Sequence, residues 1–183
     1  QDNPELWNKI ISQEVLDARI RYALKNNGKI LIVGGGHGTE VDILVEKYGK
    51  GIVKHIWFND NIISFTNEVK RKYNKINILK GDLLSLIIKM KFDVILGNPP
   101  YQETARRKLW PVFSSLVIEK YLKDDGVVAF ITPSNFLDSR MSVVKKMLDN
   151  LKKYNTKIIN NNINNFFLDI GMDFTYWILE KTK

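Results

Sequence analysis

The chain has 183 residues, of which 44% are hydrophobic and 26% are charged, a composition that predicts a globular domain with a substantial single core. It has no cysteine and two histidines, which excludes disulfides, thiolate zinc sites and cysteine nucleophiles, and we expect no metal. No apolar run approaches the roughly 18 residues that span a bilayer, and the first residues lack a secretory pattern, so we expect no membrane partner and a cytoplasmic location. The net charge of +8 favours a polyanionic partner, although lysine, which is common on solvated surfaces, supplies most of it.

Residues 5–26 predict one or two helices, because apolar side chains recur there at helical spacing up to Asn26-Asn27-Gly28. We therefore separate an N-terminal helical segment, residues 1–27, from one α/β domain over residues 28–183. In that domain the expected strands are 29–33, 53–59, 76–80, 92–96 and 127–132, and the expected helices are 39–48, 62–73, 112–122 and 138–153.

Strands that alternate with helices pair in parallel, so this order predicts a doubly wound α/β sheet. Two closing strands, near 156–163 and 172–180, have too short a connection for a parallel crossover. They predict an antiparallel C-terminal hairpin.

The first expected strand runs into a glycine-rich turn that a helix follows. Gly34, Gly36 and Gly38 have the spacing Gly-x-Gly-x-Gly, which is more usual for S-adenosylmethionine than for a dinucleotide. Glycines permit the tight turn and let a cofactor approach the backbone closely. A turn without any ligand explains the same residues, so the pattern alone is a weak signal.

Carboxylates follow the next two expected strands. Asp60, with Asn59 as the alternative, lies where an acid can accept both ribose hydroxyls of a nucleoside cofactor. Asp82 can contact the adenine amine of such a cofactor, although for this residue alone the capping of a following helix is the simpler interpretation. The glycine turn and the two acids converge at the carboxyl edge of the sheet, which makes their combination more specific than any one of them.

The strongest signal is Asn98-Pro99-Pro100-Tyr101, which directly follows the strand at 92–96. The prolines fix the backbone, so their carbonyl groups can point into a site, and the Asn98 side chain adds an acceptor. Two acceptors can bind the two hydrogens of an exocyclic amine, and Tyr101 can stack on a base flipped out of a duplex. The alternative is a rigid turn at the end of the strand.

These residues resemble the amino-methyltransferases of the S-adenosylmethionine-dependent superfamily, and in particular the adenine-specific DNA methyltransferases of restriction–modification systems, Eco57I-like branch. The resemblance lies in the segments FDVILGNPPYQ, GVVAFITPSNFL and NFFLDIGMDFTYWILEK. It implies a Rossmann-like methyltransferase fold, with a mostly parallel seven-stranded sheet, and residues 28–183 as the catalytic domain. It also implies that S-adenosylmethionine contacts the glycine turn, Asp60, Asp82 and Asn98, and that residues 98–101 catalyse methyl transfer to adenine in DNA. Phe167, with Phe166 next, is the candidate for a second ring on the flipped base, although either residue could be part of the core.

Two departures from the family pattern bear on these expectations. Family members often have an acid near the end of the first strand, where this chain has Ile32 and Val33, and Glu40 is a candidate substitute. The chain also lacks a segment that resembles a target-recognition domain, so we expect that this domain has been removed, that a separate domain or subunit provides it, or that the substrate is different. Trp7 could lie near the cofactor, but we expect a core tryptophan.

Other functions compatible with the motif are methylation of an RNA amine or of a protein glutamine, and a nonenzymatic nucleic-acid-binding subunit that retains the fold. Among basic residues, we expect Arg106 and Arg107, beside Lys108, to contact phosphates near the flipped nucleotide. For a second basic group, a role in binding DNA and a solvated basic face are equally supported: Lys145, Lys146, Lys152, Lys153 and Lys157.

Overall fold

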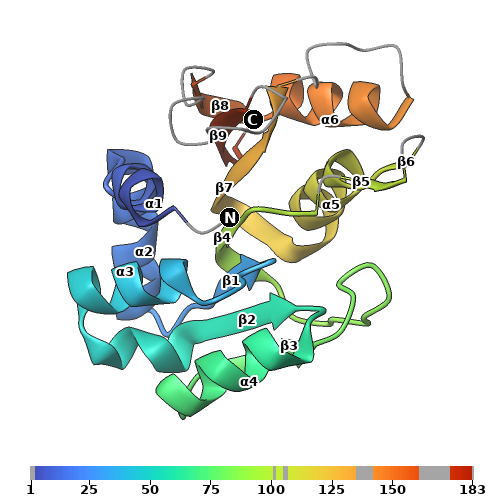
Figure 1. The fold of residues 1–183 in the computed structure, drawn as a ribbon. Coiled ribbons are helices and arrows are strands. Elements are labelled where there is room, and N and C mark those ends of the chain that lie inside the picture. The colour runs from blue at the N-terminus through green and yellow to red at the C-terminus, as the bar shows by residue number, and fades with distance from the viewer. Residues whose placement is uncertain (1–2, 101, 105–106, 135–141, 161–173, 183) are drawn as a thin grey trace.

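The structure is a computed structural model that describes residues 3–100, 102–104, 107–134, 142–160 and 174–182 (Figure 1). One sheet contains seven strands in the order β3-β2-β1-β4-β7-β9-β8, and a separate two-stranded sheet pairs β5 with β6. The strands are β1 Ile30–Val33, β2 Ile56–Asp60, β3 Asn77–Lys80, β4 Phe92–Gly97, β5 Gln102–Thr104, β6 Arg107–Lys108, β7 Leu122–Pro133, β8 Asn155–Asn160 and β9 Phe174–Glu180.

In the described part of the seven-stranded sheet the central strands run parallel, and the pairings at the C-terminal edge are antiparallel. β1 pairs with β2 and β4, β2 pairs with β3, and β4 pairs with β7, all in parallel register. β9 lies antiparallel to both of its neighbours, β7 and β8. The predicted fold class is therefore confirmed, including the antiparallel hairpin.

Helices cover both faces of the sheet (Figure 1). They are α1 Pro4–Ile11, α2 Glu14–Lys25, α3 Thr39–Tyr48, α4 Ile63–Lys72, α5 Trp110–Leu116 and α6 Ser142–Lys153, with a 3-10 helix at Lys50–His55 and a π-helical turn at Val117–Tyr121. The first four contribute apolar side chains to a core on one face, whereas α5 and α6 contribute to a core on the opposite face.

Strand β1 shows why the sequences of the central strands are continuous runs of apolar residues. Ile30 and Ile32 belong to the core under α1–α4, whereas Leu31 and Val33 belong to the core under α5 and α6. Successive side chains of a strand point to opposite faces, and helices bury both faces of a parallel sheet. An unbroken run of four apolar residues is the consequence.

The second strand begins later than its apolar pattern predicts. Residues 53–55 were expected in the strand but belong to the 3-10 helix Lys50–His55, and β2 begins at Ile56, which pairs with Ile30 at the start of β1. Val53 is still buried in the core. Burial alone therefore produced the apolar signal, because a short helix can bury a valine as well as a strand can.

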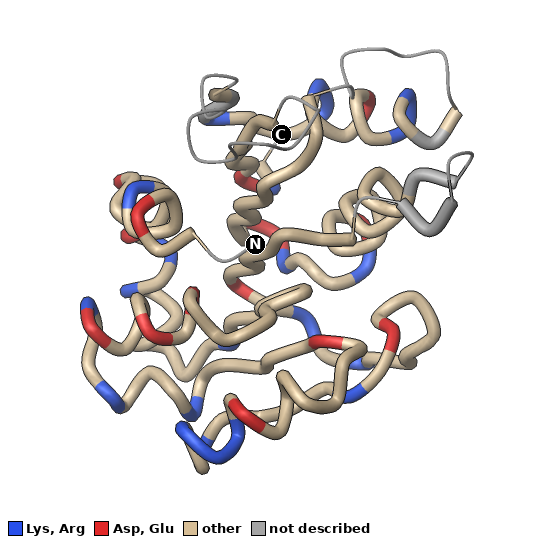
Figure 2. The backbone as a smooth tube through the Cα atoms, viewed as in Figure 1, with Lys and Arg blue, Asp and Glu red and all other residues tan. Residues whose placement is uncertain are grey.

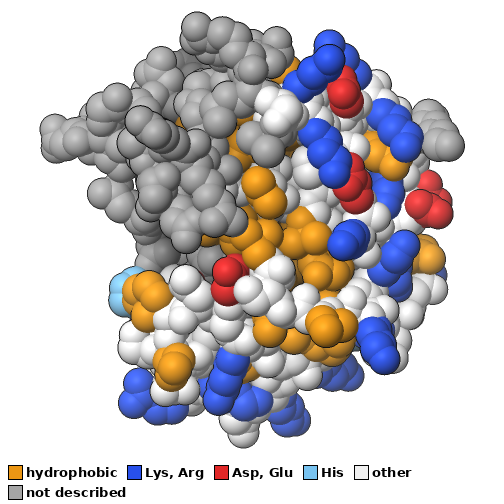
Figure 3. Space-filling view, turned by 90° about the vertical axis from the view of Figure 1, so that its right-hand side faces the viewer, with side chains coloured by type: hydrophobic (Ala, Val, Ile, Leu, Met, Phe, Trp, Pro, Cys, Tyr) orange, Lys and Arg blue, Asp and Glu red, His pale blue; other side chains and the backbone are white. Residues whose placement is uncertain are grey.

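The connection between β3 and β4 forms turns where a doubly wound fold commonly has a crossover helix. Leu83 is buried in the core beneath α5 and α6, and Leu84, Leu86 and Ile88 pack against that core. Ile87 is 90% exposed. Apolar side chains gather near the centre of the surface on this side of the molecule, and lysines and arginines lie to their right and below them (Figure 3).

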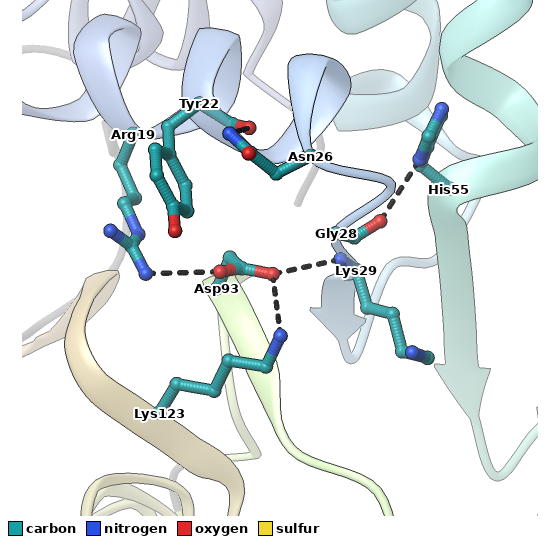
Figure 4. Close-up of polar contacts among 8 residues, drawn as sticks. All are labelled: Arg19, Tyr22, Asn26, Gly28, Lys29, His55, Asp93 and Lys123. Carbon is teal, nitrogen blue, oxygen red and sulfur yellow. Dashed lines mark hydrogen bonds and ion pairs between the residues drawn. The ribbon is translucent and has the colours of Figure 1, made fainter.

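A buried carboxylate joins four segments of the chain at the amino end of the central strands (Figure 4). Asp93 of β4 accepts hydrogen bonds from the Arg19 side chain of α2 at 3.0 Å and from Lys123 of β7 at 3.1 Å. It also accepts the Lys29 backbone N–H, just before β1, at 3.0 Å. Gly28 makes room for this carboxylate, because a Cβ there would lie 2.3 Å from Asp93 Oδ2.

Candidate functional site

Two hollows adjoin each other where β1, β2 and β4 end. The larger, about 630 Å³, extends toward the end of β3, and the smaller, about 450 Å³, extends toward α1 and α3. Both are lined by Gly34, Asp60, Asn98 and Pro100. The structure thus brings together the predicted glycine turn, the predicted acid of β2 and the start of the predicted catalytic tetrapeptide.

The glycine turn adopts backbone conformations that side chains disfavour. The φ angles of Gly34, Gly36 and Gly38 are +62°, +53° and +87°. A Cβ on Gly34 would lie 2.8 Å from the backbone oxygen of Asn98. Gly34 is therefore needed both for the turn and for the close approach of the segment that follows β4.

Asp60 holds the glycine turn while it lines both hollows. Its side chain accepts the Gly36 N–H at 3.0 Å and the Ile62 N–H at 2.9 Å. The neighbouring Asn59 points across to β3, because its side-chain amide donates to the backbone oxygens of Leu79 and Gly81 at 2.8 and 3.0 Å. Asn59 lines only the larger hollow of the two.

Asp82 lines the far end of the larger hollow and is exposed. One of its carboxylate oxygens accepts the Leu84 N–H at 3.0 Å. The capping interpretation thus has support, although the capped element is a turn and not a helix. The other carboxylate oxygen can still meet a donor in the hollow.

The segment after β4 reaches the junction of the hollows. The Asn98 N–H donates to the backbone oxygen of Val33 at 3.3 Å, which fixes this segment to the end of β1. Asn98 and Pro100 line both hollows, and Pro99 lines the smaller one. The predictions for Tyr101, Arg106 and Phe167 lie outside the described residues, and for Arg107 the structure describes only the backbone in β6.

The hollows also have walls that the motif analysis did not assign to the site. Leu109 and Phe113 line the larger hollow beside Pro100, and Phe65 lines the smaller one. Trp7 is 2% exposed, so the core prediction is confirmed, and yet it lines the smaller hollow. The sequence signal for these residues was apolar periodicity, which predicts burial but cannot separate a core from a pocket wall.

His37 and Glu40 bring polar groups to the smaller hollow. His37 is exposed, lies 3.1 Å from a carboxylate oxygen of Glu68 and makes an edge contact with the Phe65 ring at 4.7 Å. Glu40, in the first turn of α3, is only 3% exposed. Among the described residues no group of three or more His, Cys, Asp or Glu side chains could hold a metal ion. Within the same residues, no helix combines the length and apolar character of a membrane span.

This arrangement fits an elongated nucleoside cofactor. The two volumes lie in the range of small-molecule sites, and the site combines a glycine turn with carboxylates at the ends of adjacent strands. Such crevices at the carboxyl edge are where open α/β sheets bind ligands. Asn98 lies where the two arms of such a ligand would meet.

The chain is similar in sequence or in fold to known modification, restriction and methyltransferase proteins. The modification methylase CviBIII of Paramecium bursaria Chlorella virus NC1A is 29% identical over 116 residues, which cover 57% of this chain and 30% of that protein. Among solved structures, the type IIG restriction endonuclease BpuSI superposes with a TM-score of 0.74 and 16% identity, covering 100% of this chain and 25% of that chain. A class I S-adenosylmethionine-dependent methyltransferase from Listeria monocytogenes superposes with a TM-score of 0.67 and 18% identity, covering 94% of this chain and 61% of that chain.

These similarities show the fold of S-adenosylmethionine-dependent methyltransferases and imply S-adenosylmethionine as the cofactor. The chain spans only 30% of the viral methylase and 25% of the BpuSI chain. The sequence profile of the Eco57I restriction-modification methylase family matches residues 18–173, and the chain belongs to this family.

Proposed function

We propose that this chain transfers a methyl group from S-adenosylmethionine to the exocyclic amine of adenine in DNA. The observation that carries the proposal is the position of Asn98 and Pro100 at the junction of the two hollows, with Pro99 in the wall of the smaller one. A methyl donor whose two arms occupy the hollows presents its reactive centre at such a junction. The name of the viral relative, a modification methylase, supports DNA as the acceptor.

In this reaction the main contribution of the protein is to position the methyl acceptor. The lone pair of the adenine amine is delocalised into the ring, so this nitrogen attacks poorly. We propose that the Asn98 side-chain oxygen and the Pro99 backbone oxygen accept its two hydrogens, which favours a more tetrahedral and more nucleophilic nitrogen. When bound, the cofactor supplies an electrophilic methyl group. Correct alignment of the two reactants contributes much of the rate enhancement in such reactions.

Base flipping explains why aromatic residues accompany the tetrapeptide. A base inside a duplex cannot reach a pocket at the sheet edge, so it must swing out and gain new stacking partners. We propose Tyr101 and Phe167 for this stacking, and Arg106 and Arg107 for contacts with the flanking phosphates. These four roles rest on the sequence.

The proposal is tested by methyl transfer from labelled S-adenosylmethionine to duplex DNA, tRNA and a protein extract in parallel, with identification of the modified group. We expect methyladenine in DNA. Label in RNA or on protein would keep the amine chemistry and overturn DNA as the acceptor. Cofactor binding without transfer to any of the three acceptors would point to a separate recognition domain or subunit, or to the nonenzymatic alternative.

The substitution Asn98→Ala should lower the transfer rate by about 10²-fold or more, which is the usual effect of removing one transition-state hydrogen bond. Calorimetry should show nearly unchanged cofactor affinity. Asn74→Ala is the matched control, because Asn74 is exposed and lies in the turn before β3, away from both hollows. Equal losses of binding and transfer in Asn98→Ala would assign Asn98 to the cofactor site or to the fold instead.

A further inference from the structure

Glu40 is a carboxylate at an unusual place in the molecule. The buried residues of α3 are Glu40, Val41, Ile43 and Leu44, of which only Glu40 is charged. Its side chain is 3% exposed and lines the smaller hollow with Trp7 and Asn98. Glu40 thus places a buried carboxylate in the wall of the hollow, beside the proposed catalytic segment.

The surroundings of Glu40 favour a negative charge and a cationic ligand. Glu40 lies in the first turn of α3, where the helix dipole stabilises negative charge. The other acid that lines this hollow is Asp60, and backbone N–H groups of Gly36 and Ile62 already bind its carboxylate oxygens. The Asp60 carboxylate thus holds the glycine turn, and Glu40 is the second carboxylate in the wall of this hollow.

The order of the two hollows identifies the part of the cofactor that reaches Glu40. The larger hollow has Asn59 and Asp82 for a nucleoside, and the two hollows share Asn98, where the methyl group must be. The smaller hollow then receives the amino-acid end, which carries an ammonium group. The end of β1 offers this ammonium no side-chain acceptor, because Ile32 and Val33 are apolar and fully buried.

We infer that Glu40 binds the ammonium group of the methionine part of the cofactor. Glu40 is the second residue of α3, so it supplies from the helix the carboxylate that the preceding strand lacks. The inference rests on the cofactor of the proposed function and is independent of the methyl acceptor.

Calorimetry can test this contact without turnover. The ligands are S-adenosylhomocysteine and its analogue with hydrogen in place of the ammonium group, each titrated into the parent chain and Glu40→Gln. A charge-assisted hydrogen bond is worth about 10- to 100-fold in affinity. The parent should prefer S-adenosylhomocysteine by about this factor, whereas Glu40→Gln should bind both ligands with the weaker affinity of the analogue.

Glu46→Gln is the matched control, because Glu46 is an exposed residue of the same helix, and it should behave as the parent. Glu40→Asp, which keeps the charge but shortens its reach, should lose affinity for S-adenosylhomocysteine only, and it provides the same readout if Glu40→Gln does not fold. The inference is overturned if the parent binds both ligands equally or binds neither. The inference is also overturned if the Glu40 variants lose affinity for both ligands to the same extent, or if they keep the parent's affinity for both. Failure of the DNA proposal would instead appear in the transfer assay, which this titration does not involve.

Discussion

At the scale of single residues, the two neighbours Asn59 and Asp60 have different tasks. Successive side chains of a strand point to opposite sides of the sheet. Asp60 consequently reaches the glycine turn, whereas the Asn59 amide bonds to the backbone at the end of β3. The sequence placed an acid at this strand end but left the choice between the two positions open, because the side to which each residue points depends on where the strand begins.

Another residue pair, Asp17 of α2 and Tyr48 at the end of α3, joins these two helices. The Tyr48 hydroxyl donates to Asp17 at 2.5 Å, and Arg21 contacts the same carboxylate at 3.1 Å. The hydrogen bond from Tyr48 is the main cause that lowers the pKa of Asp17, with Arg21 adding to it. Burial, followed by the hydrogen bond to Asp17, raises the pKa of Tyr48.

We expect Tyr48→Phe to lower the free energy of unfolding by about 1 kcal/mol, since the pair is partly exposed and its hydrogen bond involves a charged group. Urea unfolding measures this difference. Tyr22→Phe is the control, because Tyr22 is 49% exposed and its ring, not its hydroxyl, makes the recorded contact with Arg19. An equal effect of the two substitutions would contradict the assignment.

The stability that this pair contributes should depend on pH in a defined window. A depressed pKa means that the Asp17 contribution is complete above its usual value of 3.8 and is lost as the pH falls below that value. A raised pKa means that the Tyr48 contribution is complete below its usual value of 10.0 and is lost as the pH rises beyond it. The difference between the parent and Tyr48→Phe should therefore be constant between these limits and shrink outside them.

At the scale of secondary-structure elements, Asp93 joins segments that are distant in the sequence. Its side chain is 2% exposed, and its partners come from α2, from β7 and from the residue before β1 (Figure 4). Local sequence patterns gave no sign of this network, because an Asp in an otherwise apolar strand has no periodic signature. Only the pairing of β4 between β1 and β7 brings the partners together.

Asp93→Ala should destabilise the fold by about 3 kcal/mol, because removal of one member of a buried ion pair leaves the remaining charges without compensation. The free energy of unfolding in urea is the measurement. Asp124→Ala removes an exposed carboxylate from the neighbouring part of β7 and should cost much less. A loss below about 1 kcal/mol for Asp93→Ala would show that water and backbone groups replace the network.

At the scale of the whole molecule, the chain is much shorter than the relatives that it matches. It spans less than a third of the viral methylase and of the BpuSI chain. The described lysines and arginines are spread over several elements and do not gather on one of them (Figure 2). In the second basic group, Lys146 pairs with Glu119 at 3.2 Å and Lys157 lies 3.9 Å from Glu180. These pairs support the solvated-face interpretation for that group.

We expect Arg106 and Arg107 to contribute phosphate contacts, so their joint reversal to Glu should weaken binding to DNA of any sequence. The slope of log affinity against log salt should fall by about two, one for each lost contact. The matched control reverses Lys152 and Lys153 and should leave the slope unchanged. If the first variant keeps the parent's slope, these arginines do not contact phosphates.

The sequence by itself determined the order of the elements and the edge at which the site forms. Hydrophobic periodicity depends on which side of each segment is buried, so it predicted strands, helices and their alternation. Turn-forming glycines and prolines are local requirements of the backbone, and they marked the ends of β1 and β4. The places of Gly34, of Asn98 and of a polar residue at the end of β2 follow from the carboxyl ends of parallel strands.

The tertiary structure alone decided which buried residues became walls of the site. Trp7 and Glu40 lie on different helices, and only the packing of α1 against α3 places them along one hollow. In the same way, the fold directed Asn59 toward β3 and gathered the partners of Asp93. These features depend on contacts between residues far apart in the chain, and a periodic pattern reports only that a residue is buried, not which residues surround it.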